Sequence, residues 1–325
     1  MNIKEFLANP DWDTPFFKRL AHNDTGRAAG HQGGIVLPKD LRCFLPTLDE
    51  SAISPITPTI DRYLLVEMFI GLTYLTNGVV RYQFQTWRGT RSPESRLTDG
   101  FRPILVQARQ GDFLVFQRRS DALDYFRLTL VKQDTPEYNE ISRLANNRRW
   151  GPLYLSDPPV TQSELTRAEQ EVIRLANFPF VVQKSKISRV ETRQNRIARS
   201  SAFAEKVRQE YGRKCAVSGI IIATPRMLYE VESAHVVPVS EGGLDDIRNG
   251  FALTQTLHWA FDQGLFGVDP KKRTIYIPKQ VKQMKENAYL NQFEGRQISE
   301  AKNQNFRVHE DAFDWHFKNR VKPWD

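Results

Sequence analysis

The chain has 325 residues, a length that favours two domains over one. Its 46 Lys and Arg exceed its 38 Asp and Glu, and the net charge of +8 with a pI near 9.4 indicates a polyanionic partner. The sequence has no run of about eighteen apolar residues, so no membrane span is expected. The N-terminus lacks the apolar core of a signal peptide. The sequence has two cysteines, Cys43 and Cys215, which are far apart, so a disulfide framework is not expected and a cytoplasmic location is favoured. Neither cysteine has a CxxC partner, which argues against a structural zinc site.

Residues 1–135 are predicted to form short strands, because segments rich in β-branched and aromatic residues are separated by Gly, Pro, Asn and Asp. These segments are "GGIVLPKDL", "DRYLLVEMFIGL", "VVRYQFQTW", "RPILVQAR", "DFLVFQRR" and "YFRLTLVKQ". Such spacing is typical of an all-β barrel or sandwich.

The chain then changes character. Residues 136–160 are polar and punctuated by proline, and a helix is expected after them with Thr161 or Ser163 as its cap. Its apolar side chains recur at helical spacing, at Leu165, Ala168, Val172 and Leu175.

The segment 181–214 holds ten Lys and Arg and only three acids, a net charge of +7. One interpretation is a solvated basic linker over 181–200. The other is an arm that contacts phosphates, since clustered cations gain affinity by releasing DNA counterions. Arg193 and Arg196 are the candidate phosphate contacts. The end of the segment, "SSAFAEKVRQEYG", predicts a helix capped by Ser201 and ended by Gly212.

After Gly212, two apolar runs in "RKCAVSGIIIATPRMLYEVESAHVVPVS" predict a β-hairpin, and "LTQTLHWAFDQG" predicts a short helix. His258 and Asp262 are four residues apart on that helix, so both side chains lie on one face and can reach one metal ion. His235 ends the preceding strand, and Asn249 lies in the loop between.

The order His, Asn, His across strand, loop and helix resembles the ββα-metal nuclease motif known as HNH. The segments "YGRKCAVSG", "AHVVP" and "RNGFALTQTLHWAFDQGLFGVD" carry the resemblance, which covers about residues 200–275. It implies metal-dependent hydrolysis of phosphodiesters, with His235 as the general base, Asn249 bracing the loop that orients it, and His258 as a metal ligand. Asp262 is the expected second ligand.

This sequence departs from the wider superfamily at two positions. Ala234 stands where many members have an acidic or His metal ligand. Glu232 can replace that ligand only if the strand bulges or twists, because alternation puts Glu232 and His235 on opposite faces. Ser218 stands where many HNH proteins have the second cysteine of a zinc-binding pair, so no structural zinc is expected.

The N-terminal segments "NDTG…GHQ-G…P" and "SPESRLT" resemble the effector domain of the EcoRII restriction endonuclease, a B3-like DNA-binding pseudobarrel, over roughly residues 14–130. The resemblance implies two arms that read bases in a major groove, with Arg pairing to guanine, Glu to cytosine and Gln to adenine. The candidates are Asn23, Asp24, His31, Gln32, Arg88, Arg91, Glu94 and Arg96. The alternative is that Asn23, Asp24, Gly26 and Gly30 only shape turns.

Together these observations predict an α+β protein: an all-β B3-like pseudobarrel at 1–135, a helical and basic linker at 136–199, and an HNH nuclease domain at 200–325. The expected function is a type II-like restriction endonuclease that uses Mg²⁺, with Mn²⁺ or another transition metal as the alternative. Its partner is double-stranded DNA, and a homodimer is expected because one HNH site usually cuts one strand. The alternatives are a nuclease that depends on base methylation and a DNA-binding regulator with an inactive HNH fold.

Overall fold

A computed structural model describes residues 2–25, 34–87, 92–120, 122–183, 192–224 and 229–325. The chain divides into two compact units. The sheet unit comprises Met1–Leu165 and Arg193–Ala198. The second unit comprises Thr166–Thr192 and Arg199–Asp325, and we call it the nuclease unit after its resemblance to the HNH motif. The long helices α4 (Gln162–Leu175) and α5 (Arg193–Glu210) each contribute residues to both units.

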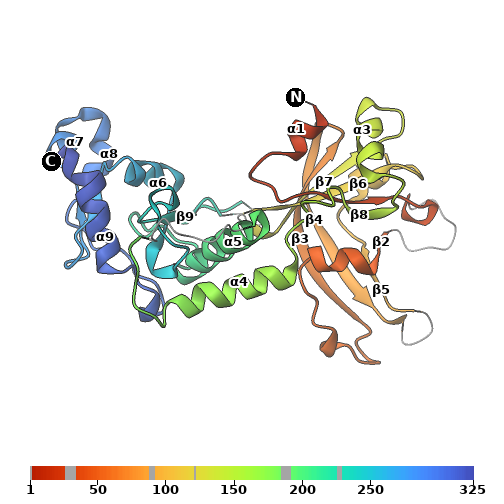
Figure 1. The fold of residues 1–325 in the computed structure, drawn as a ribbon, viewed down its shortest axis with the longest axis horizontal. Coiled ribbons are helices and arrows are strands. Elements are labelled where there is room, and N and C mark those ends of the chain that lie inside the picture. The colour runs from red at the N-terminus through yellow and green to blue at the C-terminus, as the bar shows by residue number, and fades with distance from the viewer. Residues whose placement is uncertain (1, 26–33, 88–91, 121, 184–191, 225–228) are drawn as a thin grey trace. The chain divides into compact units, whose positions relative to one another are not determined.

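The sheet unit is built on one large, curled, eight-stranded sheet (Figure 1). The strand order is β2-β5-β4-β3-β7-β6-β1-β8, and neighbours are antiparallel except β3 and β7, which are parallel. The strands are β1 (Phe16–Arg19), β2 (Ile35–Leu37), β3 (Thr59–Ile70), β4 (Thr73–Gln85), β5 (Glu94–Leu97), β6 (Phe113–Arg119), β7 (Ala122–Val131) and β8 (Trp150–Pro152). The expected β-rich N-terminal half is therefore confirmed as a half-barrel.

Alternation along the strands gives this sheet two apolar faces. Phe16 stacks on Phe116, with ring centroids 4.9 Å apart, in the core inside the curl. Its neighbour Phe17 points to the other face and packs edge-on against Phe113 at 5.6 Å. The short helices α1 (Ile3–Leu7) and α3 (Pro136–Ala145) bury their apolar residues against this second face.

A buried lysine joins the turn at His22–Thr25 to the curled sheet. Lys18 on β1 places its Nζ 2.7 Å from Asp24 Oδ1 and also donates to the carbonyl oxygen of Val36 on β2. Asp24 in turn accepts from the backbone N–H of Val36 at 3.1 Å and of Ala21 at 2.7 Å. Because β1 and β2 are far apart in the strand order, these bonds join distant parts of the sheet.

One predicted strand is wrong. "RPILVQAR" forms the helical turn α2 (Arg102–Leu105), because Pro103 lies in its first turn, where a missing N–H costs nothing. Phe101, Ile104 and Ala108 are fully buried inside the curl, which shows that the apolar run fills the core without pairing as a strand. Three short 3-10 turns, η1 (His22–Thr25), η2 (Lys39–Phe44) and η3 (Glu50–Ala52), complete the connections.

The predicted helices are present, with one boundary moved. Leu165, Ala168 and Val172 are buried along α4, as their spacing predicts. Helix α5 begins at Arg193, eight residues before the expected cap, so Ser201 lies inside the helix and is 2% exposed. Gly212 follows with φ +61°, the left-handed conformation that ends a helix.

The nuclease unit has small sheets and short helices. Its elements are β9 (Glu232–His235), β10 (Gly250–Leu253), α6 (Gln255–Asp262), β11 (Gly267–Val268), β12 (Ile275–Tyr276), α7 (Lys279–Gln283), α8 (Ala288–Asn291) and α9 (Glu310–His316). Single turns lie between or after them at Val239–Glu241, Ile247–Asn249, Lys285–Asn287, Gln304–Phe306, Phe317–Val321 and Lys322–Trp324.

The predicted hairpin within 213–240 is confirmed only in part, as one antiparallel bridge between Ala223 and Tyr229 and a hydrogen bond from Glu230 N–H to the Ile222 carbonyl oxygen at 3.0 Å. β9 pairs antiparallel with β10, which follows it in the chain, from Gly250 opposite His235 to Leu253 opposite Glu232. The earlier apolar run instead lies at the surface, where Ile220, Ile221 and Ile222 are 40–57% exposed. Apolar composition alone did not reveal which segment would be buried.

None of the described helices has the length and apolar character needed to cross a membrane.

We expect Asp24→Ala to destabilise the sheet unit by about 3–5 kcal/mol, since it leaves the buried Lys18 ammonium without its counterion. The measurement is urea-induced unfolding of the full chain. The matched control is Asp61→Ala, because Asp61 pairs with Arg81 at the surface, where such a pair contributes at most about 1 kcal/mol. Equal losses of stability in the two variants would contradict the role assigned to Asp24.

Candidate active site

The hairpin β9–β10 and helix α6 bring the predicted nuclease residues together (Figure 1). His235 is the last residue of β9 and lies opposite Gly250. A Cβ at Gly250 would come within 2.3 Å of the Phe203 ring, so only glycine fits at this position. Phe203 from α5 stacks on the His235 ring, with centroids 4.0 Å apart and planes 13° apart. The Asn-Gly pair therefore makes room for the ring that holds His235.

Asn249 holds the loop between the two strands. Its Oδ1 accepts from the backbone N–H of Val237 at 2.9 Å. Its Nδ2 donates to the carbonyl oxygens of Val237 and Leu244, both at 3.0 Å. The residue is 1% exposed. Every one of these bonds goes to backbone on either side of the loop, so Asn249 is placed to brace it.

The His235 ring is fixed at its edge by a carboxylate. Nε2 lies 3.1 Å from Asp245 Oδ1, and Asp245 Oδ2 lies 3.5 Å from Nη2 of Arg199. The Asp245 side chain is only 9% exposed. An ionised Asp245 accepts a hydrogen bond from an Nε2 proton, which leaves Nδ1 of His235 as the basic nitrogen.

His258 on α6 lies between two carboxylates. Its Nδ1 is 2.8 Å from Glu232 Oε2, and its Nε2 is 3.6 Å from Asp262 Oδ2. β9 reaches this arrangement with continuous pairing to β10 and no bulge. Glu232 thus contacts His258 from a regular strand. The sequence alone predicts Glu232 only as a metal ligand, and only from a bulged or twisted strand.

The charges of these groups affect one another. Burial by itself lowers the pKa of His258, but the hydrogen bond to Glu232 and the charge of Asp262 outweigh it, so the pKa is raised. Burial raises the pKa of Asp262, while the charges of His258, Arg320 and His235 act in the opposite direction. The influence of His235 on Asp262 places the proposed base and the proposed metal ligands in one electrostatic environment.

The residues of this site fit a divalent ion that binds few protein ligands. Within the described ranges, no group of three His, Cys, Asp or Glu is arranged around one point. His258 Nε2 and Asp262 Oδ2 are nevertheless close enough to ligate one ion, since each bond is about 2.0–2.2 Å long. Ions such as Mg²⁺ keep several waters and bind through one or two carboxylates and substrate phosphates.

A buried arginine attaches the end of α4 to the active-site loop. Arg248 pairs with Asp246 at 2.7 Å and donates to the carbonyl oxygens of Leu175 at 2.8 Å and Phe178 at 2.9 Å. Carbonyl oxygens at the C-terminus of a helix lack helical partners and carry partial negative charge, so a guanidinium suits them. The residue next to Asn249 is thereby fixed as well.

Comparison with protein families gives residues 215–269 as a match to the HNH_2 family, described as HNH endonuclease. This range contains His235, Asn249, His258 and Asp262. Residues 215–269 form an HNH endonuclease domain. HNH nucleases generally use a divalent metal ion.

Two solved structures are similar to this chain. One is the modification dependent TagI restriction endonuclease, with 15% identity and a TM-score of 0.31, over 70% of this chain and 56% of TagI. The other is the N-terminal domain of Helicobacter pylori LlaJI.R1, with 13% identity and a TM-score of 0.28, over 42% of this chain and 95% of that domain. No curated protein matches the chain. The chain thus aligns with little more than half the length of TagI.

The predicted base-reading residues of the first arm are only partly described. His31 and Gln32, like Arg88 and Arg91 of the second arm, lie outside the described residues. Asn23 is exposed in the turn η1. Asp24 is 1% exposed and bonded to Lys18 and to two backbone N–H groups. These contacts are those of a residue that shapes the turn, so we leave Asp24 out of the proposed DNA surface.

Glu94 and Arg96 lie in the sheet and not on a free arm. β5 pairs with β2 on one edge and β4 on the other. The two side chains share one side of the strand, with Arg96 Nε 2.8 Å from Glu94 Oε1. Arg96 is 7% exposed and its Nη1 has no hydrogen-bond partner among the described residues. A base contact by Arg96 would require the Glu94 pair to open.

Arg193 and Arg196 belong to helix α5 and not to an extended linker. Arg193 pairs with Asp157 and donates to Thr14 Oγ1 at 3.3 Å, so its charge is partly neutralised within the sheet unit. Arg196 is exposed on the same helix. Of the two, Arg196 remains the better candidate for a phosphate contact.

Two residues of the active site were missed in the sequence. Asp245 contacts His235 from the loop, at a separation of ten residues that no helix or strand period indicates. Phe203 contacts it from α5, more than thirty positions upstream. The only available signal was that "GGLDDIRNG" concentrates acids directly before Asn249.

We expect Asn249→Ala to lower the free energy of unfolding of the nuclease unit by at least about 1–3 kcal/mol, because buried backbone groups of Val237 and Leu244 lose their partners. Cleavage should fall with it. The measurement is chemical unfolding followed alongside DNA cleavage. Asn305→Ala removes an exposed amide of the same unit and should change neither; an equal effect in both variants would overturn the bracing role.

Proposed function

We propose that this endonuclease is a restriction-type enzyme: the sheet unit binds double-stranded DNA at chosen sequences, and the HNH site hydrolyses the backbone. The observation that carries the proposal is the convergence of His235, His258 and Asp262 on the hairpin and helix of the HNH domain. A net charge of +8 suits the DNA partner.

In the proposed reaction, Nδ1 of His235 removes a proton from the attacking water. Asp245 accepts the Nε2 hydrogen bond and so selects the tautomer with a basic Nδ1. Arg199 pairs with Asp245 at 3.5 Å, and Phe203 stacks on the His235 ring and fixes its plane. Asp245 is thus a positioning residue, analogous in its chemistry to the carboxylate that orients a catalytic imidazole.

His258 and Asp262 are the proposed metal ligands. Glu232 accepts a hydrogen bond from Nδ1–H of His258, which leaves the Nε2 lone pair free for the ion. We therefore propose that Glu232 orients a ligand and does not bind the ion itself. A bound divalent ion neutralises the charge that develops on the phosphate oxygens. Mg²⁺ suits the carboxylate, and the imidazole also suits Mn²⁺ and other transition ions.

A homodimer on DNA follows from the same proposal. Each chain has one HNH site, and one such site is suited to cutting one strand. A double-strand break therefore requires two chains or two successive events. The second candidate, a nuclease that requires base methylation, uses the same catalytic residues and differs only in which bases the sheet unit accepts.

We expect the endonuclease to convert plasmid DNA into discrete fragments with Mg²⁺ or Mn²⁺. His235→Ala should lower the single-turnover rate by roughly 10²–10⁴-fold, the usual contribution of a general base, while DNA binding is retained. The measurement uses methylated and unmethylated plasmids side by side. Fragments from only the methylated plasmid would select the methylation-dependent candidate, and random nicking of both would contradict sequence-specific recognition.

Asp245→Asn should lower the rate less than His235→Ala, because the amide can still donate to Nε2 but then stabilises the wrong tautomer. Histidine-selective ¹⁵N NMR of the metal-free protein reads the tautomer of His235 directly. An Nε2-protonated ring in the parent and a changed tautomer in Asp245→Asn are expected. An unchanged tautomer together with an unchanged rate would remove Asp245 from the mechanism.

We also expect His258→Ala to weaken Mn²⁺ binding, since it removes the imidazole ligand. Calorimetric titration with Mn²⁺ measures this without reference to cleavage. Glu232→Gln should weaken binding less, because the amide can still accept from Nδ1–H. His309→Ala is the matched control, since that imidazole stacks on Phe180 and accepts from Asp311 N–H instead of contacting a proposed ligand. Tight Mn²⁺ binding by His258→Ala, or cleavage by the parent in excess EDTA, would exclude this metal site.

A further inference from the structure

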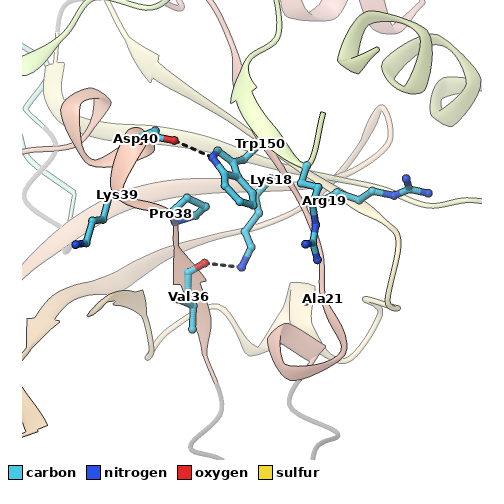
Figure 2. Close-up of a pocket in the computed structure, with 9 residues that line it drawn as sticks. Lys18, Arg19, Ala21, Val36, Pro38, Lys39, Asp40 and Trp150 are labelled. Atoms are coloured by element: carbon cyan, nitrogen blue, oxygen red, sulfur yellow. Dashed lines mark hydrogen bonds between the residues drawn. The ribbon is translucent and has the colours of Figure 1, made fainter. Parts of the chain in front are cut away.

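The sheet unit has a pocket of about 400 Å³, which no part of the nuclease mechanism uses (Figure 2). Residues from β1, from the β2–η2 segment and from the start of β8 line it. All of these residues belong to the sheet unit. Its volume lies in the range of sites that enclose a small organic group, about 300–1,000 Å³.

The lining is strongly cationic. Lys18, Arg19, Lys39 and Arg149 contribute four positive charges, and Asp40 contributes one negative charge. Lys18 is paired with Asp24, and Arg19 donates to Tyr138 and to the carbonyl oxygen of Gly111.

Lys39 and Arg149 are both exposed, and within the described ranges neither side chain has a hydrogen bond or ion pair. Burial lowers the pKa of Lys18, and the positive charges of Arg149 and Arg96 lower it further, against the pull of Asp24. Among the described residues, the positive charges of the lining therefore exceed the negative ones.

An aromatic wall accompanies these charges. Trp150 is 37% exposed, and its Nε1–H donates to Asp40 Oδ2 at 3.2 Å, which fixes the indole at the pocket wall. Figure 2 shows its ring beside the stem of Lys18, with Pro38 next to it. A fixed aromatic face with an apolar neighbour and nearby cations matches the chemistry of a nucleotide, whose base stacks and whose phosphate is anionic.

We propose that this pocket binds a single nucleotide of the DNA substrate that has left the base stack, with its base against Trp150 and its phosphate at Lys39 and Arg149. The proposal rests on the proposed DNA-binding function of the sheet unit. It adds that recognition includes a base held outside the helix, where its edges can be read from all sides. An unpaired or mismatched base enters such a pocket at the lowest cost, because less pairing and stacking is lost.

The test measures binding of the full chain, in EDTA so that no DNA is cut, to labelled duplexes that differ only by one unpaired nucleotide. We expect the parent to bind the duplex with the unpaired nucleotide roughly 5- to 100-fold more tightly, the range of one base–aromatic stack. Trp150→Ala should abolish this preference, and Trp150→Phe, which keeps an aromatic face, should retain most of it. Tyr63→Ala, which removes a 59% exposed ring elsewhere in the same unit, should leave it unchanged.

The cations are tested separately. Lys39→Ala with Arg149→Ala should weaken binding of the extrahelical nucleotide more than Arg102→Ala, an exposed cation on α2. The four deoxynucleoside 5′-monophosphates and inorganic phosphate, titrated alone, distinguish the source of the ligand. Tight binding of a free monophosphate, without any preference among the duplexes, would assign the pocket to free nucleotides and overturn the proposal.

Failure of this inference differs from failure of the proposed function. Equal affinity of the parent for both duplexes, or a preference that survives Trp150→Ala, overturns only the pocket. Absence of binding to either duplex overturns the DNA-binding role of the sheet unit and the pocket together. An inactive HNH site changes neither measurement, because cleavage is not read.

Discussion

The active site depends on the hydrogen bonds of one buried amide. Asn249 satisfies a donor and two acceptors of the backbone around the loop between β9 and β10. This fixes the end of β9, where His235 emerges, relative to the start of β10, which leads directly into α6 with His258 and Asp262. An apolar side chain of similar size would leave those backbone groups unpaired. The proposed base and the proposed metal ligands are on different elements, and Asn249 holds the loop that joins these elements.

His235 and His258 each contact one carboxylate, but through different ring nitrogens. His235 faces a carboxylate at Nε2, and His258 faces one at Nδ1. An ionised carboxylate favours the tautomer in which the bonded nitrogen carries the proton and the other nitrogen is basic. In the proposed mechanism, Nδ1 of His235 is then free to remove a proton and Nε2 of His258 is free to bind a metal ion. The positions of Asp245 and Glu232 thus separate the proposed roles of the two imidazoles.

The sheet unit also depends on a few buried polar contacts within an apolar core. The Lys18–Asp24 pair is surrounded by the core of the curled sheet and joins β1 to β2. It also positions the lysine stem beside Trp150 (Figure 2). A residue that secures the fold therefore contributes to the charge of the pocket.

The sequence by itself determined the HNH residues, the helix that carries His258 and Asp262, and the β-rich N-terminal half, because these depend on local spacing and strand or helix period. It did not determine the partner of β9, the helical turn at Arg102–Leu105 or the early start of α5. Those depend on which apolar surfaces meet in three dimensions, and local propensity is overridden when burial favours another pairing. Only the tertiary structure revealed Asp245 beside His235, Glu232 beside His258 and Trp150 beside Lys18. Each of these contacts joins residues whose separation in the chain follows no structural period, so their chemistry emerges only when the chain has folded.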